Sequence, residues 1–277
     1  KDSTPFISEF DFNFNYYFKC GTSCISDTEG AFKLICNGCQ LYDSLGNIVE
    51  GGDTLTPVSL CNWFSGSITY AQASIILPLG SNRYSVVTAT VSDSVFSLWT
   101  TLGAPFLQAY DIIQQHIVDM NLNGGHGKVI KKQILMQDVP MSRTQMMACR
   151  HADGKSWWLL KQGKDSNKVY KFVITEDSVY NFGWQKFEEP VWGNFDEQGQ
   201  SMFNHTGNKY VSCAAPKNQI FFADFNRCNG QITNQRILNP PLNPVSPTFQ
   251  MIDSFPVGLC FSPNDSFLYV TTNYNIY

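Results

Sequence analysis

Apolar and polar residues alternate over short runs along this chain, and the runs close at Gly, Asn or Asp. β-branched and aromatic residues fill runs of about four to eight positions, which is typical of strands joined by tight turns. The 3.6-residue period of an amphipathic helix is almost absent. The pattern therefore predicts an all-β chain. We expect a hairpin over residues 31–49 and a set of four strands at 73–79, 83–91, 112–120 and 128–137.

A polar turn between two strands recurs in the second half of the chain. The segments 150–159, 203–212 and 261–270 align without a gap. Gly154, Gly207 and Asp265 occupy the same turn position, which spaces the units by 53 and 58 residues. A second strand-like segment follows each turn. It covers 168–174 in the first unit and 219–225 in the second, and the third unit holds only its first residues, 275–277.

A unit of about 50 to 60 residues that holds four strands has the size of a β-propeller blade. We therefore predict a β-propeller of four-stranded blades in which residues 1–277 form one domain with about five blades, the last one incomplete. A propeller buries both faces of each blade and closes its ring to remove open sheet edges. For this reason we expect a longer protein with roughly six to eight blades.

Charge and composition narrow the choice of partner. The net charge is −4, and only 15% of the residues are charged, against about 25% in an average globular chain. Lysine and arginine are scattered singly, so a nucleic-acid partner is disfavoured, because phosphate binding needs a clustered basic surface. No apolar run approaches the roughly 18 residues of a membrane-spanning helix, and we expect no transmembrane segment.

The cysteines are concentrated near the start of the chain. Five of the nine fall in the first 61 residues: Cys20, Cys24, Cys36, Cys39 and Cys61. This concentration predicts disulfide bonds made in an oxidising compartment, with at least one thiol left over and the pairing open. The alternative is a structural zinc site at the first four of these cysteines. It is less favoured, because they lie in strand-like sequence rather than in tight knuckles.

Several motifs together resemble a known family. They lie at 21–23, 25–30, 36–39, 49–53, 119–129, 150–158 and 258–270. These segments are similar to large secreted propeller proteins of Bacteroidetes-type bacteria. The last of them resembles the Phe-Ser-Pro-Asp-Gly turn and Leu-Tyr-Val strand of WD40-like and lactonase-like propellers. The resemblance implies a protein that is secreted or displayed on the surface of a bacterium, often through type IX secretion, and it implies no particular reaction.

The same resemblance implies covalent modification. Such bacteria O-glycosylate the pattern Asp-Ser/Thr-apolar after export, which would place sugars on Ser44, Thr54, Ser94 and Ser178. Asp-Ser is also ordinary turn chemistry, and this is the alternative at each position.

Arg150 and His151 are the candidate binding residues of the first repeated turn. The other two repeats carry Phe203 and Phe261 where Arg150 stands. In a functional interpretation Arg150 clamps an anion and His151 acts as a general base at the mouth of the ring. The favoured interpretation is architectural, with Arg150 as a stacking or capping group beside a hairpin turn. Sugar rings could stack on Trp63, Trp184 and Trp192 if these are exposed, and the favoured alternative is that they pack between blades.

Motifs for catalysis are missing from the sequence. The four histidines are not spaced as a metal-binding pair on one strand, and the glycine-rich segment 121–127 lacks the lysine and helix that phosphate binding uses. There is no Gly-x-Ser-x-Gly sequence. We therefore expect no cofactor, and we predict a binding or scaffold module whose loops recognise a protein or glycan partner.

Two other functions stay open at this point. One is a hydrolase of the lactonase-like or glycan-processing type, which three or more Asp, Glu, His or Asn side chains converging in the central channel would favour. The other is a structural component of an extracellular assembly.

Overall fold

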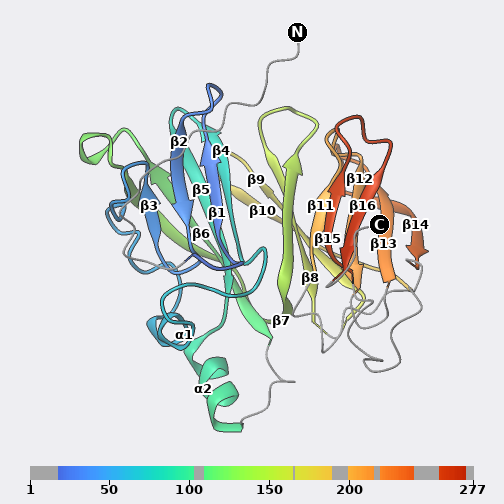
Figure 1. Ribbon diagram of the computed structural model, residues 1–277, viewed down its shortest axis with the longest axis horizontal. Helices are drawn as coiled ribbons and strands as arrows, with labels where there is room; N and C mark the ends of the chain where they lie inside the picture. The colour runs from blue at the N-terminus through green and yellow to red at the C-terminus, as the bar shows by residue number, and fades with distance from the viewer. Residues whose placement is uncertain are drawn as a thin grey trace.

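The protein is all-β, as the hydrophobic pattern predicts. The computed structural model describes residues 18–102, 109–164, 166–188, 199–214, 219–239 and 256–272, and its sheets are antiparallel throughout (Figure 1). The first sheet has the order β1-β2-β3 and consists of β1 (Ser23–Ser26), β2 (Phe32–Cys36) and β3 (Leu41–Asp43). The last two sheets are β11 (Ser201–Phe203), β12 (Lys209–Ala214), β13 (Gln219–Phe225) and β14 (Ile232–Leu238), followed by β15 (Pro256–Phe261) and β16 (Leu268–Thr272).

Between them lies a sheet of seven strands in consecutive order. Its members are β4 (Ser74–Gly80), β5 (Arg83–Thr90), β6 (Tyr110–Asp119), β7 (Lys128–Arg150), β8 (Trp157–Gly163), β9 (Lys168–Ile174) and β10 (Val179–Lys186). Strand β7 is 23 residues long and serves two meanders. Its first part pairs with β6, and its last part pairs with β8. The seven strands are therefore two four-stranded units that share one long strand.

Counted this way, the described chain forms five consecutive meanders, which we call blades 1 to 5. Blade 1 is β1–β3, blade 2 runs from β4 to the first part of β7, and blade 3 runs from the last part of β7 to β10. Blade 4 is β11–β14, and blade 5 is β15–β16. The first strand of each blade contacts the first strand of the next, through the pairs β1 and β4, β4 and β7, β7 and β11, and β11 and β15. Blades that radiate from adjacent inner strands are the arrangement of a β-propeller, so the predicted fold class is confirmed.

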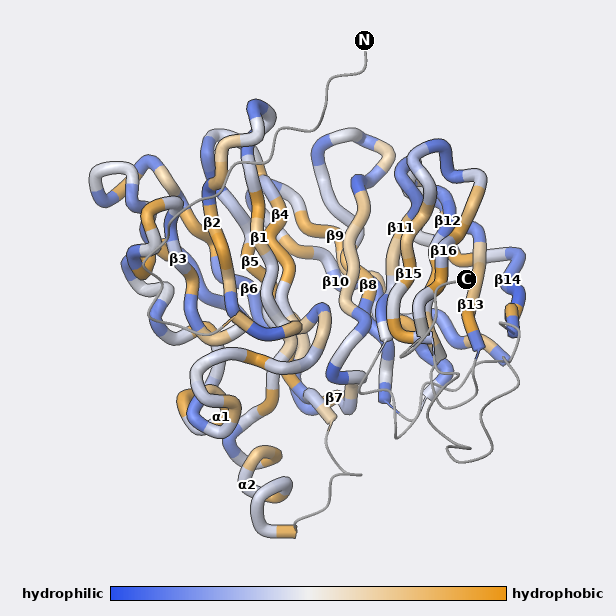
Figure 2. Tube along the Cα trace, in the orientation of Figure 1, coloured by the Kyte–Doolittle hydropathy of each residue, from blue (hydrophilic) through white to orange (hydrophobic). Residues whose placement is uncertain are grey.

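The hydrophobic core is divided among the interfaces between blades. Separate clusters of buried side chains join blade 1 to 2, 2 to 3, 3 to 4 and 4 to 5. Strand β8 contributes to both of its neighbours, because Leu159 packs toward blade 2 while Trp158 and Leu160 pack toward blade 4. Central strands buried on both faces have nearly continuous apolar sequence, and Figure 2 shows the hydrophobic residues gathered along the strands while the turns are hydrophilic.

The repeated turn has the same backbone hydrogen bonds in all three copies. The amides of His151, Asn204 and Ser262 donate to the carbonyl five residues later, over 2.9, 3.2 and 2.9 Å. The residue at the shared turn position has a positive φ each time, 73° at Gly154, 71° at Gly207 and 57° at Asp265. Glycine adopts this conformation without a steric penalty, which accounts for two of the three residues.

Asp265 is the exception at this position, and its carboxylate explains it. The side chain accepts hydrogen bonds from the turn of the preceding blade, including the His205 backbone amide at 3.1 Å and the Asn204 side-chain amide at 2.9 Å. It also lies 2.7 Å from Nδ1 of His205. A carboxylate at the left-handed turn position therefore ties blade 5 to blade 4.

Comparable polar contacts join the other blades. Nδ1 of His126 lies 2.7 Å from a carboxylate oxygen of Asp43, between blades 2 and 1. The indole N–H groups of Trp157 and Trp158 donate to the carbonyls of Pro78 and Arg227, at 2.9 and 2.7 Å, which joins blade 3 to both of its neighbours.

Two helices correct the expectation that helical segments are almost absent. They are α1 (Val58–Trp63) and α2 (Asp93–Leu102), and a short 3₁₀ turn covers Asn123–Gly125. The Ser92 hydroxyl caps α2 by accepting a hydrogen bond from the Val95 amide at 3.3 Å, and it donates to the Asp111 carboxylate at 2.7 Å. Segments of two or three helical turns that bury few side chains carry little periodicity. Among the described residues no helix is long and apolar enough to cross a membrane.

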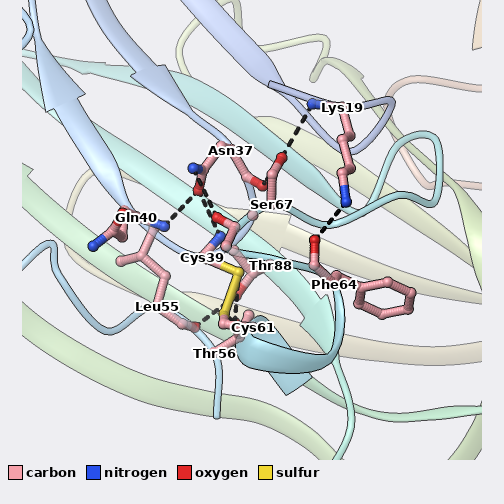
Figure 3. The surroundings of a disulfide bond; sticks show 12 residues. Lys19, Asn37, Cys39, Gln40, Leu55, Thr56, Cys61, Phe64, Ser67 and Thr88 are labelled. Carbon is pink, nitrogen blue, oxygen red and sulfur yellow. Dashed lines mark hydrogen bonds between the residues drawn. A yellow bond between two sulfur atoms is a disulfide. The ribbon is translucent and has the colours of Figure 1, made fainter. Parts of the chain in front are cut away.

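A disulfide bond links Cys39 to Cys61, which confirms that disulfides form within the cysteine-rich start of the chain (Figure 3). It joins the connection between β2 and β3 to α1. Asn37 orders this connection by accepting hydrogen bonds from the Cys39 and Gln40 amides at 2.9 and 2.7 Å. The other three candidates, Cys20, Cys24 and Cys36, are free thiols. Because Cys39 is oxidised, the alternative zinc site of four thiolates is not formed.

Removing this disulfide should destabilise the protein. The bond closes a loop over a sequence separation of 22, for which constraint of the unfolded chain contributes about 3 kcal/mol. We expect Cys39→Ala/Cys61→Ala to lower the free energy of unfolding by about that amount in urea titrations. The control, Cys20→Ser/Cys24→Ser, should unfold like the parent. Equal midpoints for the parent and the Cys39→Ala/Cys61→Ala variant would contradict the pairing.

His116 is buried between blades 1 and 2 beside the backbone of Leu55. It is 1% exposed on β6, and no described residue offers either ring nitrogen a hydrogen bond of ordinary geometry. Burial, with a smaller contribution from the charge of Lys132, lowers the pKa of His116 to about 4.

The stability of the protein should consequently depend on the protonation of His116. Between pH 4 and the ordinary pKa of 6.5, the unfolded chain binds a proton that the folded chain does not, so the free energy of unfolding rises with pH. The rise amounts to at most about 3 kcal/mol, and His116→Leu should remove it. Urea unfolding at pH 7 and 4.5 measures the difference. If both proteins lose the same stability on acidification, His116 is not the group responsible.

Candidate functional site

A hollow that includes the sequence-predicted residues Arg150 and Ser178 lies between blades 2 and 3. Three adjoining cavities of about 130, 300 and 400 Å³ surround the turn Thr175–Ser178, which connects β9 to β10. We call this hollow the blade 2–3 cleft. Its charged and amide lining residues are Arg83, Gln115, Lys131 and Gln133 from blade 2, and Arg150, Asp153, Lys155, Glu176, Asp177 and Asn181 from blade 3.

Two contacts across the cleft hold its walls together. The Trp157 indole donates to the Pro78 carbonyl, and Arg83 forms an ion pair with Glu176. Beneath them the two blades share the core cluster that contains Ile117, Phe172 and Ile174. The cleft therefore has walls set by packed strands, and the charged residues stand at its rim.

Arg150 is held in place by an aromatic ring and a carbonyl. Its guanidinium carbon lies 3.9 Å from the centre of the Trp157 ring, and one of its N–H groups donates to the Lys155 carbonyl at 2.7 Å. Partial burial lowers the pKa of Arg150, although Asp153 counteracts this, and an arginine remains charged in any case. Both predicted roles of this residue are compatible with the geometry, because stacking uses the face of the guanidinium while most of its N–H donors stay at the edge.

The Asp153 carboxylate forms its hydrogen bonds within its own turn. Its carboxylate accepts hydrogen bonds from the backbone amides of Lys155 and Ser156, both at 2.8 Å, and from the Ser156 hydroxyl at 2.7 Å. Burial alone would raise the pKa of Asp153, but these hydrogen bonds and the neighbouring His151 hold it well below its usual range. The carboxylate therefore stays ionised, and its hydrogen bonds stabilise the turn between β7 and β8.

His151 also belongs to the turn. Its Nδ1 accepts a hydrogen bond from the Asp153 amide at 3.1 Å, and its ring lies 5.6 Å from the ring of the fully buried Trp158. A histidine whose Nδ1 is engaged in this way has only Nε2 left for a ligand. Arg150 is the member of the pair that lines the cleft.

The aromatic candidates lie apart from the cleft. Trp63 is 60% exposed at the end of α1, where its ring contacts Phe96 edge to face. Figure 1 places α1 at the opposite end of the sheets from the hairpin between β7 and β8. Trp184 is half exposed on β10, with Lys168 Nζ 4.5 Å from its ring centre. Trp192 lies outside the described residues.

The glycosylation candidates are accessible to different degrees. Thr54, Ser94 and Ser178 are exposed, and Ser44 is half-buried in the turn after β3. Ser178 lines the blade 2–3 cleft, so a sugar attached there would occupy it.

The inner part of the interface between blades 3 and 4 holds buried polar groups that the sequence analysis missed. Gln162 donates to the Tyr210 and Ser212 hydroxyls, and Gln145 donates to the Cys213 carbonyl. The side-chain oxygens of both glutamines have no hydrogen-bond partner among the described residues. Gln145 has a φ of 64° and lies at the bulge in β7 where pairing with β8 is interrupted. Within the described ranges no group of three His, Cys, Asp or Glu side chains is placed to hold a metal ion.

Lys161 is fully buried on β8, where its ammonium group donates to the Thr144 carbonyl. Burial lowers the pKa of Lys161 to about 7. The sequence carries one signal for it, because this lysine directly follows the apolar run Trp157–Leu160 within a central strand.

No protein-family model matches the sequence, and no curated protein matches it. Solved structures do show likeness. A Desulfotomaculum acetoxidans protein of unknown function is 12% identical, over 88% of this chain and 59% of its own, with a TM-score of 0.46. The periplasmic gluconolactonase of Pseudomonas aeruginosa is 14% identical, over 91% and 61%, with a TM-score of 0.44.

The Cps50 β-propeller domain of Myceliophteria thermophila is 12% identical, over 90% of this chain and 80% of its own, with a TM-score of 0.38. The chain thus spans about three fifths of the first two proteins. Likeness of this extent carries no conclusion about activity, and any function has to be argued from the residues of this chain.

Because Lys161 is buried, the free energy of unfolding should depend on pH in the alkaline range. Between pH 7 and 10.5 the unfolded chain keeps a proton on this lysine that the folded chain releases, so the free energy of unfolding rises with pH, by at most about 1.4 kcal/mol per unit. Lys161→Met should abolish the rise and should unfold at a higher urea concentration than the parent at pH 7, because no buried amine has to lose its solvation. Exposed Lys155→Met is the control. An unchanged slope between pH 7 and 9 in Lys161→Met would disprove the assignment.

Proposed function

We propose that this chain is a binding module of a protein that is secreted or displayed on a bacterial surface, and that the blade 2–3 cleft receives a protein or glycan partner. The observation that carries the proposal is the position of Arg150. It stands where the other two repeats carry Phe203 and Phe261, it lines a cavity of about 400 Å³, and its guanidinium is preorganised by Trp157. Cavities of roughly this volume suit small ligands or segments of larger ones.

The chemistry of the described side chains favours binding over hydrolysis. Asp153 is taken up by its turn, and Glu176 is paired with Arg83. The inner face between blades 3 and 4 presents glutamine amides and hydroxyls rather than converging carboxylates. Such groups hold a partner by hydrogen bonds and offer no pair of acid and base for bond cleavage.

Export is supported by two observations. The disulfide between Cys39 and Cys61 is characteristic of oxidising compartments, and the motifs resembling Bacteroidetes-type propellers imply type IX secretion and O-glycosylation at Ser44, Thr54, Ser94 and Ser178. Mass spectrometry of protein purified from its native source would detect hexose-containing peptides at these positions if the proposal is correct.

Binding can be tested with arrays and a matched pair of variants. The chain is screened against an array of neutral and acidic oligosaccharides and against a random peptide library. We expect selected ligands to bind at least about tenfold more weakly to Arg150→Ala/Lys155→Ala, because two cations of the cleft are removed.

The control is Lys168→Ala/Lys186→Ala, which removes the same charge from β9 and β10 without touching the cleft lining. Both variants should unfold within about 1 kcal/mol of the parent, since each removes one exposed lysine and one half-buried cation that stacks on a tryptophan ring. The proposal fails if no array ligand distinguishes the two variants.

A further inference from the structure

The charges of the blade 2–3 cleft do not cancel once the contacts within the protein are counted. Asp153 is saturated by its own turn, and Arg83 and Glu176 neutralise each other. Lys131, Arg150 and Lys155 form no ion pair with a described residue, and Asp177 is the corresponding free carboxylate. Hydrogen bonds from neutral groups leave the negative charge of Asp153 in place. The lining therefore carries four cations (Arg83, Lys131, Arg150 and Lys155) against three carboxylates (Asp153, Glu176 and Asp177), and the excess of one positive charge favours a negatively charged ligand.

The rest of the lining is aliphatic. Ile130 and Ile134, on the outer part of β7, are 46% and 54% exposed beside the cavities, and Ile117 and Leu135 line them. The aromatic residues at the cleft offer no free ring face, because Phe172 is fully buried and Arg150 covers the ring of Trp157. Sugar rings usually bind proteins by stacking their C–H faces on aromatic rings, and such a platform is missing from this lining.

From this combination we infer that the partner is a protein and that the blade 2–3 cleft takes an extended acidic peptide segment with aliphatic side chains between its carboxylates. This inference rests on the proposed function and narrows its partner to one class. One carboxylate binds at Arg150 and Lys155, and another binds near Lys131. The aliphatic side chains of the segment cover Ile130 and Ile134, which removes apolar surface from water.

The segment lies in the cleft rather than adding a strand to the outer edge of β7, where Lys128 and Val129 already pair with Glu50. The register between β6 and β7 shifts at three places along this edge, and the edge carries Lys128, Lys131 and Lys132. Bulges and lysines are the usual means by which an edge strand avoids pairing with another chain. Recognition therefore uses side chains, and charge decides which peptides bind.

Fluorescence anisotropy with defined probes tests the inference on the full chain. The probes are a labelled nonapeptide of alternating Asp and Val, its Asn and Lys counterparts, and an oligogalacturonate that carries the same number of carboxylates. The variant Lys131→Glu/Arg150→Glu reverses both ends of the cationic surface. Lys168→Glu/Lys186→Glu makes the same change of charge outside the cleft.

We expect the Asp peptide to bind, and the Asn peptide to bind at least about tenfold more weakly. Reversing the two cleft charges should weaken the Asp peptide about 100-fold and favour the Lys peptide, whereas the control variant should bind like the parent apart from a small long-range effect. Raising the salt from 50 to 500 mM (about 3.2-fold shorter screening length) should weaken the interaction.

Two results would overturn the inference in different ways. If oligogalacturonate binds more tightly than the Asp peptide and loses affinity in Lys131→Glu/Arg150→Glu, the cleft is a binding site but its partner is an acidic glycan. If neither acidic probe distinguishes that variant from the control, the acidic-peptide inference is wrong, and the array experiment with Arg150→Ala/Lys155→Ala decides separately whether the cleft binds any ligand.

Discussion

Burial of both faces of every blade is the constraint on which the rest of this structure depends. A four-stranded meander is too thin to have a core of its own, so its side chains must be covered by the blades on either side. Four clusters of apolar side chains meet this requirement, one at each interface between consecutive blades. Strand β8 shows the consequence for sequence, because Leu159 serves one interface and Trp158 and Leu160 serve the other. Its run is apolar throughout instead of alternating.

The same constraint explains where polar chemistry can occur. Where a strand is covered on both faces, a polar side chain is buried together with its neighbours, as His116 on β6 and Lys161 on β8 are. Farther out, the hairpin ends of the blades diverge, and charged residues can line the space between them. The blade 2–3 cleft lies at such a position, above a shared apolar cluster and bridged by Arg83 and Glu176. A ligand site of this kind depends on rigid strands for its shape and on turn residues for its charge.

Polar contacts at the turns complement the apolar interfaces. Each consecutive pair of blades is joined by at least one hydrogen bond or ion pair between residues far apart in sequence, such as His126 with Asp43 and His205 with Asp265. Where a partner is exposed, as His205 is, such a contact contributes little stability, whereas Asp43 and Trp158 form theirs as buried groups. These contacts are also directional, so they restrict how one hairpin can be oriented against the next.

The sequence by itself determined the class of the fold, its repeat and the region of its disulfide. Strand runs, turn residues and the spacing of Gly154, Gly207 and Asp265 are local features, and a strand or a tight turn forms from neighbouring residues. Only the tertiary structure decided that Cys39 pairs with Cys61, that β7 is shared by two blades, that α1 and α2 form, and that Arg150 rather than His151 faces a cleft. Each of these depends on which segments, distant along the chain, become neighbours when the blades bury their faces. No local sequence pattern predicts which segments become neighbours, because the free energy that selects them comes from the interface between blades and not from either blade alone.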